Sequence, residues 1–150
     1  MPFQERNTVA YLFVGGLTMT LVGWRLVYLH QAGRFGGDDA LQLWAQTILI
    51  AVVLGILATI GATILSNILW SIANREPKPS FVTDERDRQF EIRASRVTSI
   101  VAGIGYLIAL IVLATGQSAL FGFTVIFYAF SVGDFAGNLY RLRLYRAGAG

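Results

Sequence analysis

The sequence contains no cysteine, one histidine and three prolines, and only 14% of its 150 residues are charged. Without cysteine the chain forms no disulfides, no thiolate site, no iron–sulfur centre and no Cys-x-x-Cys-His haem attachment. His30 alone cannot supply both axial ligands of a bis-histidine haem. The 55% of residues that are hydrophobic leave too few polar side chains to cover a soluble domain. The composition therefore predicts a membrane protein.

A charge-free run from Ala40 to Asn74 is long enough to cross a bilayer. Together with three further apolar stretches it gives four predicted spans, at about residues 8–28, 41–72, 97–114 and 119–140. Residues 116–118 form so short a loop that the last two spans must pack antiparallel. We predict an all-α fold, a single membrane domain over residues 1–150 that forms a four-helix bundle of two antiparallel transmembrane hairpins.

Lysine and arginine are unevenly distributed among the loops. Of the ten basic loop and tail residues after Arg6, nine lie between the second and third spans or at the C-terminus, and only Arg34 lies on the other side. By the positive-inside rule, both termini and the segment 75–96 are cytoplasmic. We expect the plasma (inner) membrane of a prokaryote as the location. Because the basic residues cluster at helix ends, we interpret them as setting the orientation of the chain in the membrane. We expect no nucleic acid as a partner.

The segment before the third span carries charges of both signs. Opposite charges lie at helical spacing, and Phe90, Ala94 and Val97 form a narrow apolar edge, so the segment is predicted to be a helix that continues into the span. It is either a solvated extension of that span or a docking surface. Six basic residues against five acidic ones between Arg75 and Arg96 favour a protein partner over anionic lipid. The candidate docking residues are Asp84, Glu85, Arg86, Asp87, Arg88, Glu91 and Arg93.

A resemblance to a known family rests on the box Asp84-Glu85-Arg86-Asp87, the following residues 91–96, the last two spans and the tail 138–146. This second half of the chain resembles a family of small predicted bacterial and archaeal membrane proteins of unknown function with a D-E-R-(D/E) loop. The resemblance implies a membrane topology and brings no activity. It does not extend to the first two spans.

Small and polar residues recur along the second span at every fourth position. Small residues let helix backbones approach closely within a membrane, and hydroxyl groups can form hydrogen bonds there. Gly133 and Gly137 repeat the pattern in the fourth span. We therefore expect the second span to be the centre of the packing. Its stripe comprises Thr47, Ala51, Gly55, Thr59, Thr63, Asn67 and Ser71.

Two charged residues lie within the predicted spans. Arg25 can extend its side chain to the outer surface beside Trp24 and Tyr28, so it is predicted to be an anchor. Asp134 is too short to do so, and it lies at a depth similar to Asn138 and Arg96. We predict that Asp134 is a structural carboxylate, held by hydrogen bonds or by an ion pair with Arg96 or its neighbours. The alternatives are the handling of protons or cations and a contact with another subunit.

The sequence contains no nucleophile beside a base, no metal-ligand spacing and no phosphate-binding glycine loop after a strand. We therefore predict that the protein is not an enzyme and binds no cofactor. The expected function is that of an accessory or regulatory subunit of a membrane assembly. It would contact the bilayer and act by packing with a protein partner or as a homo-oligomer. The alternative is a small transporter or channel that uses Asp134.

Overall fold

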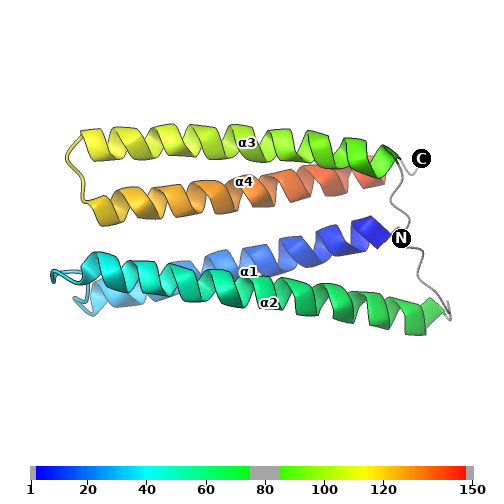
Figure 1. Cartoon of the computed structure of the whole chain (residues 1–150), viewed down its shortest axis with the longest axis horizontal. Helices are drawn as coiled ribbons and strands as arrows, with labels where there is room; N and C mark the ends of the chain where they lie inside the picture. The colour runs from blue at the N-terminus through cyan, green and yellow to red at the C-terminus, as the bar shows by residue number, and fades with distance from the viewer. Residues whose placement is uncertain (1–2, 75–84, 148–150) are drawn as a thin grey trace.

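Four helices make up most of the part of the chain that the computed structural model describes, residues 3–74 and 85–147. They are α1 (Phe3–Gln31), α2 (Ala40–Asn74), α3 (Glu85–Ala114) and α4 (Ala119–Ala147), and no strand occurs in those two ranges (Figure 1). Each helix is long and apolar enough to cross a bilayer. The prediction of an all-α, multi-pass membrane protein is confirmed.

The third span and the charged segment before it form one continuous helix, α3, as the sequence predicts. Glu85 and Asp87 lie in its first turn, where the helix dipole favours negative charge. Asp84 lies outside the described residues. Because α3 is uninterrupted, the packing of its apolar side chains also fixes the directions in which the charged side chains of its first turns project.

Glycines end α1 and α3. Gly33 and Gly116 have φ angles of 68° and 80°, which place them in the left-handed region that favours glycine. After α3, the Gly116 and Gln117 amides donate to the carbonyls of Leu113 and Val112, the pattern of a Schellman motif. The Ser118 hydroxyl then accepts a hydrogen bond from the Phe121 amide and caps α4. The predicted tight connection between the last two spans is therefore confirmed.

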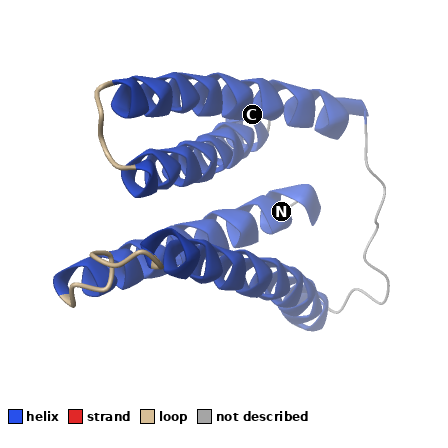
Figure 2. Cartoon of the chain, turned by 60° about the vertical axis from the view of Figure 1, so that its left-hand side comes forward, coloured by secondary structure: helices blue, strands red, loops and turns tan. Residues whose placement is uncertain are grey.

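The helices form two hairpins that lie side by side (Figure 1). The α1–α2 and α3–α4 loops lie at one end, called the loop end, and the start of α1 and the end of α4 lie at the other, called the terminal end. Helix α3 packs on α4, α4 packs on α1, and α1 packs on α2. Helices α2 and α3 form no packed interface within the described ranges, so the bundle is open on one side (Figure 2).

Two glycines of α4 lie directly against the backbone of α3. A Cβ atom on Gly133 would lie 2.9 Å from the Thr98 carbonyl oxygen of α3, and one on Gly137 would lie 2.9 Å from the Ala94 carbonyl oxygen. Both separations are too short for real carbon atoms, so only glycine lets the two backbones approach this closely. Ala102 packs against the same surface from α3 and is also buried.

The expectation that the second span is the centre of the packing is wrong. None of the described side chains of α2 is buried, and α2 packs closely on α1 alone while touching α4 more weakly. The central element is α4, which packs against α3 and α1 and also touches α2. Small residues permit a close approach but do not create one. A Cβ atom on Gly55 would lie 3.6 Å from the nearest Thr18 atom, an ordinary contact.

Candidate functional site: a lateral groove with one carboxylate

A groove of about 870 Å³ runs between α2 and α4, with α1 as its floor. We call it the lateral groove. It exists because α2 leans on α1 and leaves a gap beside α4, where a closed bundle would have an interface. The residues that line it include Tyr11, Val14, Gly15, Thr18 and Met19 of α1, Ala51, Val52, Gly55, Ile56, Thr59 and Ile60 of α2, and Phe127, Ser131, Asp134, Asn138 and Arg141 of α4.

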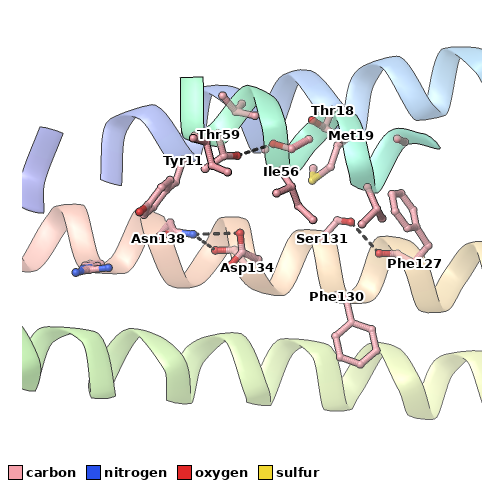
Figure 3. A pocket seen from close by; sticks show the side chains of 17 residues that line it. Tyr11, Thr18, Met19, Ile56, Thr59, Phe127, Phe130, Ser131, Asp134 and Asn138 are labelled. Carbon is pink, nitrogen blue, oxygen red and sulfur yellow. Dashed lines mark hydrogen bonds between the residues drawn. The ribbon is translucent and has the colours of Figure 1, made fainter. Parts of the chain in front are cut away.

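The middle of the α2 stripe lines this groove. Ala51, Gly55 and Thr59 are part of its wall, and their small size makes the groove wide. The Thr59 hydroxyl donates to the Gly55 carbonyl of its own helix at 2.8 Å. On the opposite wall the Ser131 hydroxyl likewise donates to the Phe127 carbonyl at 2.9 Å (Figure 3). Both hydroxyls are thus engaged within their helices, which leaves the walls effectively apolar.

Asp134 is the only carboxylate among the groove residues of the described chain. Because Gly133 and Gly137 face α3, the next residues along α4, Asp134 and Asn138, are turned about 100° away from it, one residue's rotation in a helix. They point toward α1 and α2 (Figure 3). The Asn138 amide donates to Asp134 Oδ2 at 3.1 Å and to the Asp134 carbonyl at 3.0 Å. Helix α4 therefore presents an exposed carboxylate to the groove, oriented by the residue one turn later.

The predicted ion pair between Asp134 and Arg96 is wrong. No basic side chain of the described residues lies within salt-bridge distance of Asp134, and Arg96 is exposed on α3. The two residues do lie on adjacent helices, but the glycine face of α4 separates them. The signal for this arrangement was in the sequence, since a helix that turns Gly133 and Gly137 toward α3 cannot also turn Asp134 toward it.

We therefore expect Asp134→Ala and Arg96→Ala to change stability independently. Because the two side chains share no partner, the free energies of unfolding of the single variants should add in the double variant to within about 0.5 kcal/mol. Chemical denaturation of the protein in detergent measures this cycle. If the double variant loses less free energy of unfolding than the two single variants together, by more than about 0.5 kcal/mol, the two side chains interact and the ion pair exists.

Polar residues tie α1 to α2 at the terminal end. The Arg6 guanidinium donates to Asn67 Oδ1 at 3.0 Å, and the Asn67 amide donates to Asn7 Oδ1 at 3.2 Å. Arg6 also stacks over the Trp70 ring, with its Cζ 4.8 Å from the ring centroid. Asn7 is only 5% exposed. Asn67, which the sequence analysis assigned to packing, is therefore a hydrogen-bonding centre, and its partners Arg6 and Asn7 were missed.

The other ties were also missed by the sequence analysis, and all of them involve α4. The Arg141 guanidinium donates to Gln4 Oε1 at 3.3 Å, and Arg146 lies 3.8 Å from Glu5. Further along, the Tyr128 hydroxyl donates to the Met19 carbonyl at 3.1 Å, and Trp44 Nε1 donates to the Thr124 hydroxyl at 3.0 Å near the loop end. The aromatic residues with polar atoms inside predicted spans were the available signal, because such atoms need partners in a membrane.

Arg25 and the remaining stripe residues lie outside the lateral groove. The Arg25 guanidinium is exposed near the loop end, 5.6 Å from the Tyr28 ring centroid, as an anchor at the membrane surface would be. It lines a smaller cavity of about 310 Å³ between α1 and α2 together with Thr47. Thr63 lies toward the terminal end, and its hydroxyl is buried without a hydrogen-bond partner among the described residues.

The predicted docking residues lie on the first turns of α3. Glu85, Arg86, Arg88, Glu91 and Arg93 are exposed and Asp87 is half-buried, whereas Asp84 is outside the described residues. Phe90 packs edge-on against Tyr145 of α4, with ring centroids 5.2 Å apart, and Ala94 is buried. The apolar edge predicted from the sequence therefore attaches these turns to α4. The charged side chains of these turns do not line the lateral groove.

Comparison with protein-family models, with curated proteins and with solved structures finds no match for this chain. The resemblance of its second half to a membrane-protein family therefore stays a prediction. Within the described residues no group of three or more His, Asp or Glu side chains is placed to hold a metal ion.

Proposed function

We propose that the protein is a non-enzymatic accessory or regulatory subunit of a membrane assembly, located in the inner membrane of a prokaryote. It acts by association, with its apolar helices in the bilayer and the charged turns of α3 on a protein partner. The observation that carries the proposal is the attachment of those turns to α4 through Phe90 and Ala94. A merely solvated extension needs no such attachment, whereas a docking surface benefits from a fixed register because less side-chain and backbone entropy is lost on binding.

The test is photo-crosslinking in living cells, with p-benzoylphenylalanine placed singly at positions 88, 91 and 93 and, as a control, at position 117 in the loop between α3 and α4. Adducts larger than the 16.4 kDa chain are expected at the three α3 positions and not at 117. A homo-oligomer gives an adduct of two chains, and a different partner gives another mass. Absence of adducts at all three positions, or equal adducts at 117, would refute the proposal.

A charge swap sharpens the same test. Arg88→Glu combined with Glu91→Arg keeps net charge and helix propensity nearly constant but exchanges the two signs at the docking surface. The adduct at position 93 should then be lost while melting in detergent is unchanged. If the adduct persists, contact at this surface does not depend on its charges, and the proposal that the charged side chains mediate docking is wrong.

The orientation is part of the proposal. Nine of ten basic loop and tail residues after Arg6 support a cytoplasmic terminal end. Reporter fusions after Gly37, Pro79 and Gly150 should show periplasmic activity at the first and cytoplasmic activity at the other two. Cytoplasmic activity at Gly37 would reverse the topology and remove the α3 surface from the cytoplasm.

A second candidate function is transport of a cation, and one observation favours it. Asp134 projects into an open groove between helices that cross the membrane, and intramembrane carboxylates of this kind mark ion and proton paths in transporters. Proteoliposomes should then show a cation- or proton-coupled flux that Asp134→Asn abolishes while folding is retained. The absence of any flux in the unsubstituted protein, under both proton and sodium gradients, would leave association as the function.

A further inference from the structure

The lateral groove has the chemistry of a ligand site with one unmet charge. Its walls are mostly apolar side chains, and the hydroxyls of Thr59 and Ser131 are bonded within their own helices. Asp134 is the exception, because its carboxylate accepts only the Asn138 amide and has no basic partner among the described residues. A carboxylate between membrane-spanning helices is costly unless it is paired or neutralised.

The residues around the groove do not neutralise this carboxylate. Arg141 lies in the same groove but about 10 Å further along α4 by helical rise. Its guanidinium donates to Gln4 of α1. A positive charge that pairs with an ionised Asp134 would therefore come from outside the described helices. Of the described groove residues, Asp134 and Arg141 alone carry a formal charge at neutral pH.

The donor set selects the kind of cation. Divalent ions such as Ca²⁺ and Mg²⁺ take six or more oxygen ligands, whereas Asp134 is the only carboxylate among the described groove residues, and its neighbours on α4, Ser131 and Asn138, offer one side-chain oxygen each. The groove instead offers a large apolar volume and the aromatic rings of Tyr11 and Phe127, which attract cations through their faces. A cation with an apolar body of its own uses both features.

We propose that the lateral groove binds hydrophobic organic monocations, with Asp134 as the counter-ion and the small residues of α2 making room for the apolar body. The proposal goes beyond association and does not depend on it, since the charged turns of α3 take no part in the groove. It also does not require transport, because a site can bind a cation without moving it across the membrane.

The test uses tetraphenylphosphonium, a monocation of this class, and tetraphenylborate, an anion of nearly the same size and shape. The 150-residue protein is placed in phosphatidylcholine nanodiscs, whose zwitterionic lipid adds no net charge, and binding to protein-free discs is subtracted. Saturable binding of one phosphonium per chain is expected, with little saturable binding of the borate. Equal saturable binding of the two ions, or no saturable binding of the cation, would overturn the proposal.

Variants then locate the site. Asp134→Asn should weaken phosphonium binding at least tenfold, about 1.4 kcal/mol. Asp134→Glu should keep it within a few-fold. Asp38→Asn, which removes an exposed carboxylate in the loop between α1 and α2, outside the groove, should have no effect. Full-strength binding by Asp134→Asn would place the cation elsewhere.

A steric variant keeps the proposal falsifiable if Asp134→Asn does not fold. Ser131→Phe fills the groove beside Asp134 and leaves the carboxylate in place, so it should also weaken binding at least tenfold, with helicity by circular dichroism and the size-exclusion profile unchanged. Folded Ser131→Phe that binds the cation at full strength would show that the groove is not the site.

Discussion

Replacing Gly133 with leucine should destabilise the protein by about 3 kcal/mol, the upper end of the usual cost of overpacking. A Cβ atom at this position would lie 2.9 Å from the Thr98 carbonyl oxygen and 3.2 Å from the Ala102 amide nitrogen. Both neighbours are backbone atoms of α3, which cannot move aside without separating the helices. The hairpin of α3 and α4 should therefore open.

Gly103→Leu is the matched control, because Gly103 is an exposed glycine of α3 and a Cβ atom there meets nothing within 4 Å. Unfolding by titration with a denaturing detergent, followed by circular dichroism, measures both variants. We expect Gly103→Leu to unfold within about 0.5 kcal/mol of the original protein, as surface substitutions usually do. Similar destabilisation by both variants would mean that leucine at any glycine harms the helices and that close packing of α3 on α4 is not the cause.

Asn67→Leu should cost about 2 kcal/mol, the scale of a lost hydrogen bond to a charged group. The change removes the acceptor of the Arg6 guanidinium and the donor to Asn7 in one step. Asn7 is buried, so its amide oxygen would be left without this partner in an apolar environment. Loss of the tie should loosen the terminal end of α1 from α2.

Ser66→Ala is the control for Asn67→Leu, since the Ser66 hydroxyl donates at 3.0 Å to the Thr63 carbonyl of its own helix and joins no other helix. It should change the free energy of unfolding by less than about 0.5 kcal/mol. Arg6→Leu combined with Asn67→Leu should recover part of the loss, because replacing both partners with apolar groups leaves no stranded charge. A double variant that is as unstable as the sum of its parts would show that Asn67 stabilises α2 by some other means.

The local features of the chain followed from the sequence. The continuous helix from Glu85 to Ala114 was predicted from alternating charges that lead into an apolar stretch, and its apolar edge at Phe90 and Ala94 does face α4. The short loop at Gly116 required the α3–α4 hairpin. These predictions rest on interactions between residues close in the chain, so they need no knowledge of which helices meet.

The candidate site could be predicted only in part. Asp134 was identified because a carboxylate inside an apolar span is rare. Its predicted partner, Arg96, was wrong because that prediction considered only the depth of the two residues in the membrane and not the direction in which α4 turns Asp134. The stripe on α2 was identified as well, but it does not make α2 the centre of the packing. Its small residues widen the groove around Gly55, and α2 lies at the edge of the bundle.

By itself the sequence determined that this protein crosses a membrane as four helices, because a charge-free run such as Ala40–Asn74 is stable in hydrocarbon only if its backbone groups bond within one helix. Only the tertiary structure decided that α4 is central, that α2 lies at the edge, and that Asp134 faces a groove. The reason is physical: in a membrane the packed face and the lipid-facing face of a helix are both apolar. Hydrophobicity therefore does not tell them apart, and close fits such as Gly133 on Thr98 decide which helices meet.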